Sequence, residues 1–130
     1  MFYLLLLLVI FCIIMSLRTL FLPYKMKGKF VSLENFLSIG YVYATVVLGF
    51  GIIYMVFAFN GRPLLIETGM VRNDNIFETC FYFSAMTMFS VGNGDVIPHG
   101  LGRIITVIEA LIGYTLPAAF ITRAVFDKDQ

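Results

Sequence analysis

The stretch Thr87-Met88-Phe89-Ser90-Val91-Gly92-Asn93-Gly94-Asp95 alternates glycine with other residues in its second half. It follows a short apolar segment and precedes an apolar segment of membrane-spanning length. Because glycine has no Cβ, it adopts backbone angles that let successive carbonyl oxygens face one axis. Such a ladder of oxygens can replace the hydration shell that a cation loses in a pore. One chain supplies only one wall of a pore, so the pattern predicts several copies around a symmetry axis.

The composition of the chain is typical of a membrane protein. Of its 130 residues, 60% are hydrophobic and only 13% are charged, which lies outside the usual range of soluble globular domains. A formal net charge of +1 without a basic patch gives no basis for nucleic-acid binding. His99 is the only histidine, and no cluster of Cys, Asp and Glu with metal-ligand spacing surrounds it. We therefore expect neither a structural metal site nor a cofactor.

Three apolar segments reach the length of about 20 residues that a membrane-spanning helix needs. They are Phe2 to Leu22, Phe36 to Phe59 and Leu101 to Val125. A cleaved signal peptide is the alternative for the first segment, but its start is not basic and it ends in Arg18 and bulky residues. The basic loop that follows is expected in the cytoplasm by the positive-inside rule. Its lysines are Lys25, Lys27 and Lys29.

Three spans would place the N-terminus outside the cell membrane and the C-terminus in the cytoplasm. The polar segment from Asn60 to Asn75 is then an outer loop. Ile76 to Met88 is apolar, but as a helix it would be about 20 Å long, which is too short to cross the bilayer. Asn75 and Glu78 have the spacing of a capping box at its start. This segment is therefore predicted to go into the membrane as a helix and to return.

The returning segment from Ser90 to Asp95 is non-helical backbone at membrane depth. Such backbone is tolerated only inside protein or along a water-filled path. The carbonyl end of the preceding helix would point to the middle of the membrane, where its partial negative charge favours a cation.

The sequence from Phe77 to about Val125 resembles the pore module of the tetrameric potassium channel family, especially its small bacterial members. With the preceding outer helix, the resemblance covers about two-thirds of the chain. The filter of that family usually reads Thr-Val-Gly-Tyr-Gly-Asp. Those places are occupied here by Ser90, Val91, Gly92, Asn93, Gly94 and Asp95.

The resemblance implies an all-α membrane protein in which residues 36–130 form the pore domain, with outer helix, pore helix, selectivity filter and inner helix. Residues 1–35 would add one transmembrane helix and the basic loop, and four copies would assemble in the lipid bilayer as a homotetramer. The implied function is passive conduction of K⁺ through backbone carbonyls. The K⁺ sites would lie at Ser90, Val91, Gly92 and Asn93, with Gly94 completing the filter.

Asn93 replaces the tyrosine that in the family holds the filter at a fixed width. A weakly selective or non-selective channel for Na⁺ and K⁺ with the same fold is therefore the alternative. An alternative from a different functional class is a small structural protein that packs within a larger complex. The Gly-x-Gly-Asp form of intramembrane aspartyl proteases also occurs here, but no second aspartate lies in a spanning segment. We therefore expect that the chain is not an enzyme.

Further residues have expected roles around the filter. Tyr82 and Phe83 lie where family members often have an aromatic pair that supports the filter. Gly113 falls on the family's hinge glycine of the inner helix, and Pro117 would add a kink. Asp95 is expected at the outer mouth, either as a charge that concentrates cations or as an acid that hydrogen-bonds the filter backbone.

Glu109 lies within the last span, where a charge is costly and is usually paired or neutralised. We expect it to be a buried support against the back of the pore helix. The alternative is a ring of carboxylates that faces a cavity. Helical spacing places Glu109 on one face with Gly113, Leu116 and Phe120. If these faces of the four inner helices converge below the filter, Leu116 or Phe120 would form an apolar constriction of the pore.

Overall fold

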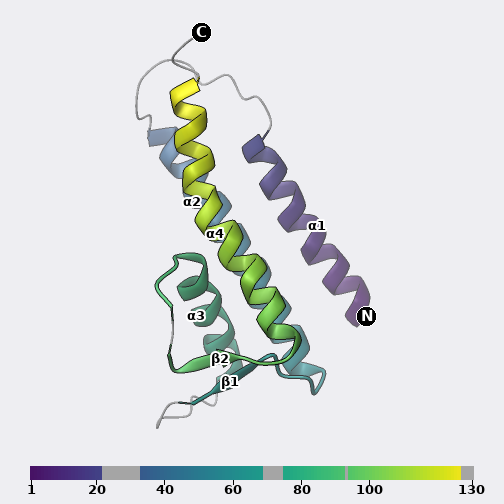
Figure 1. Cartoon of the computed structure of the whole chain (residues 1–130). Helices are drawn as coiled ribbons and strands as arrows, with labels where there is room; N and C mark the ends of the chain where they lie inside the picture. Colours follow the sequence, from purple (N-terminus) through teal and green to yellow (C-terminus); the bar gives the residue numbers. More distant parts are fainter. Residues whose placement is uncertain (22–32, 69–74, 93, 127–130) are drawn as a thin grey trace.

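The computed structural model of the chain describes residues 1–21, 33–68, 75–92 and 94–126 (Figure 1). This part of the chain contains four helices and two strands of three residues each. In chain order the elements are α1 (Phe2–Phe21), α2 (Leu33–Phe59), β1 (Leu65–Glu67), α3 (Ile76–Met88), β2 (Val96–Pro98) and α4 (Leu101–Phe126). The predicted all-α class is confirmed.

The outer helix α2 is the central element of the fold, because it contacts α1, α3 and α4. The short helix α3 packs against both α2 and α4. The N-terminus of α1 and the two strands lie toward one end of the fold, and the last turns of α4 lie at the opposite end (Figure 1). A short helix is thus held beside two long ones, as the sequence predicts for a re-entrant segment.

Two of the described helices are long and apolar enough to cross a membrane by length and composition, over Phe36–Phe59 and Leu101–Thr122. The helix α1 has 20 residues, but its apolar stretch, Phe2–Arg18, is shorter than the other two. The first span and the sidedness of the chain therefore stay predictions. The basic loop on which the orientation depends lies outside the described residues.

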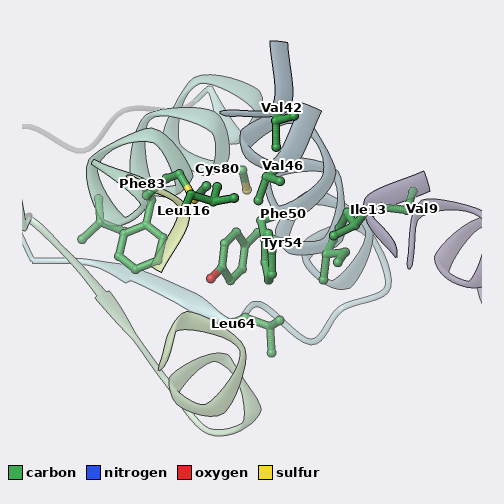
Figure 2. Close-up of a cluster of buried hydrophobic side chains, with 13 residues drawn as sticks. Val9, Ile13, Val42, Val46, Phe50, Tyr54, Leu64, Cys80, Phe83 and Leu116 are labelled. Carbon is green, nitrogen blue, oxygen red and sulfur yellow. The ribbon is translucent and has the colours of Figure 1, made fainter. Parts of the chain in front are cut away.

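The core lies mainly between α2 and α3 (Figure 2). Side chains of α2 recur every four residues and so line one face of the helix. They are Val42, Val46, Phe50 and Tyr54. Cys80 and Phe83 of α3 and Leu116 of α4 join the same cluster. Cys80 is buried and has no disulfide partner among the described residues, so it packs like a small hydrophobic residue.

The helix α1 contacts the opposite side of α2 through Val9 and Ile13, which are each 7% exposed. A Cβ at Gly49 of α2 would lie 2.7 Å from the Cδ1 atom of Ile13. The missing side chain at Gly49 therefore makes room for α1. This close approach is the kind that small residues allow between membrane helices.

The two-stranded sheet was not predicted from the sequence, which indicates only a polar outer loop there. Strand β1 pairs antiparallel with β2, with Ile66 opposite Ile97. The backbone N–H of His99 extends the pairing by donating to the carbonyl of Leu64 at 2.7 Å. Two three-residue segments are too short to show a strand pattern, so their pairing depends on the tertiary fold. The sheet ties the segment after α2 to the segment after the predicted filter.

Candidate ion-conduction site

The predicted pore helix is confirmed as α3, with thirteen residues from Ile76 to Met88. The predicted capping box at its start is wrong, because Asn75 occupies the N-cap position without a side-chain capping hydrogen bond. Instead, the Thr79 hydroxyl in the second turn donates to the carboxylate of Glu67 on β1. This contact brings a negative charge to the N-terminal end of α3, which the helix dipole favours.

The C-terminal end of α3 is a Schellman motif that redirects the chain into the predicted filter. The Ser90 N–H donates to the Thr87 carbonyl and the Val91 N–H donates to the Met86 carbonyl, each at 3.0 Å. Ser90 takes the left-handed conformation that this motif requires, with φ of 57°. Glycine is the usual residue at this place, since a side chain there costs conformational energy.

The amide groups at the start of the filter segment point back to the helix. The Gly92 N–H also approaches the Met86 carbonyl, at 3.4 Å, and Gly92 has a φ of 76°. The successive N–H groups of Ser90, Val91 and Gly92 therefore donate hydrogen bonds to carbonyls of the last turn of α3. An amide N–H repels a cation. Because these N–H groups face α3, the side of the segment that faces away from α3 is free of them.

The filter segment is exposed in the single chain. Val91 is 65% exposed, and Ser90, Gly92, Gly94 and Asp95 are also exposed. Asn93 lies outside the described residues. Exposed non-helical backbone beside a membrane helix is expected where further copies of the chain, or a water-filled path, complete the surroundings.

Thr68, directly after β1, holds the C-terminal end of this segment. Its backbone N–H donates to the Asp95 carbonyl at 2.8 Å, and its hydroxyl lies 3.3 Å from the Gly94 carbonyl. The Gly94 carbonyl, predicted to complete the filter, thus has a hydrogen-bond partner in the residue that follows β1. Thr68 has no recognisable motif around it, so the sequence analysis did not single it out.

Glu109 is fully buried, with 0% of its surface exposed, between three helices. The Ser84 hydroxyl of α3 hydrogen-bonds one of its carboxyl oxygens, and the Tyr54 hydroxyl of α2 donates to the other at 2.7 Å. Tyr54 also lies 3.1 Å from the Thr106 hydroxyl. The geometry places Glu109 behind α3 with partners in its own chain.

The hydrogens of this network can be counted. The Ser84 hydroxyl has one hydrogen, but it lies within bonding distance of both Glu109 and the carbonyl of Val47, the latter at 3.0 Å. A neutral Glu109 supplies the missing hydrogen by donating to Ser84, which then donates to Val47. The Tyr54 hydroxyl donates to the other oxygen of Glu109. A protonated Glu109 therefore allows both contacts of Ser84 to be hydrogen bonds, whereas with an ionised Glu109 only one of them is.

The two aromatic residues predicted to support the filter lie on different sides of α3. Phe83 is buried and meets the Tyr54 ring edge to face, with a centroid distance of 5.4 Å. Tyr82 is 49% exposed in the single chain. The structure therefore does not bring the two rings together, and only Tyr82 is available to a neighbouring copy.

The predicted hinge glycine lies directly against the last residue of α3. A Cβ at Gly113 would lie 3.0 Å from the carbonyl carbon of Met88 and would also contact its oxygen. Met88 is the last residue of α3, so the inner helix and the pore helix meet here without a side chain between them. The predicted constriction is wrong for Leu116, which is only 4% exposed because it packs inside its own chain.

Two long apolar helices that enclose a short helix, followed by a glycine-containing loop with buried supports, define a membrane channel module. The chain belongs to the ion channel family, whose pattern it matches over residues 42–125. The match begins inside α2, so α1 lies outside it. Membership confirms the resemblance to a channel, and it indicates transport rather than catalysis.

Similar curated proteins come from two bacilli. The chain is 41% identical over 103 residues to protein LctB of Geobacillus stearothermophilus. It is 40% identical over 103 residues to protein LctB of Bacillus caldotenax. Each alignment covers 77% of this chain and 77% of the relative. No solved structure matches the chain.

Proposed function

We propose that the chain forms a homotetrameric channel that conducts K⁺ passively across the cell membrane. The observation that carries the proposal is the direction of the amides after α3. Ser90, Val91 and Gly92 direct their N–H groups to the last turn of the helix. Their other side is left for carbonyl coordination of a cation by four chains. K⁺ would bind at Ser90, Val91, Gly92 and Asn93, and Gly94 would close the outer end.

The remaining site residues have supporting roles in this proposal. Glu109 fixes α3 from behind through Ser84, and Asp95 attracts cations to the outer mouth. Tyr82 supports the filter of a neighbouring chain, while Phe83 supports α3 within its own. We infer that α1 is a third span that packs on α2, which places the N-terminus outside and the C-terminus in the cytoplasm.

Assembly as a tetramer is the first expectation, because the carbonyls of one chain form only a quarter of an ion site. The face of α4 opposite Glu109 exposes large apolar side chains, including Leu111 at 63% and Tyr114 at 75%. Such a face suits contacts with other copies and with lipid. Native mass spectrometry of the detergent-solubilised protein is expected to show four chains. A stable monomer or trimer that still conducts would overturn the pore proposal.

Asn93 bears on the alternative, a weakly selective channel for K⁺ and Na⁺. An amide side chain is smaller than a phenol and leaves the outer filter less constrained in width. We therefore expect K⁺ conduction with a measurable Na⁺ leak. Asn93→Tyr is expected to move the reversal potential toward the K⁺ limit. Each tenfold gain in the K⁺/Na⁺ permeability ratio corresponds to about 1.4 kcal/mol of difference between the free-energy barriers of the two ions.

The matched control for this variant is Asn93→Gln, which keeps an amide and adds no ring. It is expected to leave the permeability ratio near that of the natural protein. If the natural protein is already as selective as Asn93→Tyr, packing at this position does not determine selectivity.

A further inference from the structure

Pro117 lies inside α4 and removes one hydrogen bond from the helix. In an α-helix, the carbonyl of residue 113 accepts a hydrogen bond from the N–H of residue 117. Proline has no N–H, so the carbonyl of Gly113 loses its helical partner. Within a membrane lipid tails offer no donor, so such a carbonyl is satisfied by a neighbouring helix, a side chain or an ordered water.

Tyr43 of α2 supplies this donor. Its hydroxyl donates to the Gly113 carbonyl at 2.9 Å, across 70 residues of sequence. The Tyr43 side chain is half-buried between the helices. The hydroxyl therefore replaces the N–H that Pro117 lacks, and it does so at the residue where a bend of α4 is expected.

The same tyrosine also contacts the residue that precedes the filter. Its ring stacks on Phe89 with a centroid distance of 5.5 Å and an angle of 2° between the ring planes. Phe89 is the C-cap residue of α3, and Ser90 follows directly. One side chain thus contacts the base of the filter with its ring and the inner helix with its hydroxyl.

We propose that Tyr43 is a positioning residue that couples the bend of α4 at Gly113 to the conformation of the filter. When α4 bends, the Gly113 carbonyl moves, and the Tyr43 hydroxyl either follows it or loses the hydrogen bond. If the hydroxyl follows, the ring stacked on Phe89 moves as well. This inference deepens the proposed function and rests on it, since it assigns a regulatory contact to the same filter.

A double-mutant cycle between Tyr43→Phe and Pro117→Ala tests the coupling. In the natural background, Tyr43→Phe removes the hydroxyl but keeps the ring, and it is expected to change the ratio of open to closed time about fivefold in single-channel records. Pro117→Ala restores an N–H for the Gly113 carbonyl. In that background Tyr43→Phe is expected to change the ratio less than about twofold. Equal changes in both backgrounds, or none in either, would overturn the proposal.

The role of the ring is tested separately from that of the hydroxyl. Tyr43→Leu removes the stack on Phe89 together with the hydrogen bond. It is expected to change the K⁺/Na⁺ permeability ratio, whereas Tyr43→Phe leaves that ratio unchanged. If Tyr43→Leu also leaves the ratio unchanged, the ring does not transmit a change to the filter. Tyr41→Phe is the control, because Tyr41 is on the same helix and 72% exposed.

A measurement that needs no current separates this inference from the proposed function. Thermal unfolding of the purified protein is expected to show the same dependence on Pro117. Tyr43→Phe should lower the unfolding midpoint of the natural protein, and it should leave the midpoint of the Pro117→Ala variant unchanged. A protein that shows this dependence but carries no current would support the Tyr43–Gly113 hydrogen bond and contradict the channel function. A protein that conducts but whose unfolding midpoint does not show this dependence would contradict the role of the hydrogen bond alone.

Discussion

Gly113→Ala is expected to reduce the current through the protein strongly and to destabilise it by about 1 to 3 kcal/mol, the usual range for overpacking. The added Cβ would lie 3.0 Å from the carbonyl carbon of Met88 and 3.1 Å from its Cα. These are backbone atoms, so the conflict is not relieved by rotation of a side chain. Because Met88 ends α3 and the proposed filter begins two residues later, we expect the displacement to reach that segment.

Gly40→Ala is the matched control for this variant. A Cβ at Gly40 in α2 meets nothing within 4 Å, and alanine is the better helix former by up to about 1 kcal/mol. Gly40→Ala is therefore expected to keep the unfolding midpoint of the natural protein or to raise it. The two variants are compared by thermal unfolding and by current in vesicles.

This comparison separates two roles of Gly113. If the glycine served only as a hinge, Gly113→Ala would keep the stability of the protein and change only the opening. The close contact with Met88 predicts a loss of stability as well. A Gly113→Ala protein that unfolds like Gly40→Ala would show that this contact is not required.

Glu109→Ala is expected to destabilise the protein by about 3 kcal/mol and to disturb the filter. Removing the carboxyl group leaves the buried Ser84 and Tyr54 hydroxyls without a partner, and each unsatisfied group costs about 1 to 3 kcal/mol. The cavity left by the side chain adds to this loss. The free energy of unfolding in denaturant measures the effect.

Glu109→Gln is the informative companion of Glu109→Ala. Glutamine has the shape of a neutral glutamic acid, with an N–H₂ group that can donate to Ser84 and a carbonyl that can accept from Tyr54. If Glu109 is protonated in the native protein, the glutamine variant keeps most of the stability. If the glutamine variant is as unstable as the alanine variant, the protein requires the charged form.

The short helix could be predicted with its boundaries, because Asn75 precedes the apolar segment from Ile76 to Met88 and Ser90 and Gly92 follow within four residues. The length of the two long helices follows from the same apolar pattern. Membership of the ion channel family then confirms that the chain contains a channel module. These predictions succeeded because they depend on local composition and length.

Features that depend on tertiary contacts could not be predicted. The pairing of β1 with β2 and the hydrogen bonds of Thr68 join segments that are far apart in the sequence. Helical spacing placed Leu116 and Gly113 on one face of α4 but did not show that this face packs inward. The contact between Glu67 and Thr79 could not be predicted either, because it comes from a strand that was not predicted.

One contact of the candidate site did leave a signal in the sequence. Pro117 removes the partner of the Gly113 carbonyl, so a donor from another helix could have been sought. The choice of Tyr43 among seven tyrosines still required the structure. Glu109 is similar, since a glutamate in a membrane span predicts partners without naming Ser84 or Tyr54.

The proposal that this protein is a K⁺ channel is tested most directly by its reversal potential. The purified protein is inserted in a planar bilayer with opposed K⁺ and Na⁺ gradients, and the voltage of zero current is measured. We predict a current whose reversal lies toward the K⁺ equilibrium potential, displaced from it by a Na⁺ leak. The absence of any current, or a current that does not distinguish cations from anions, would contradict the proposal.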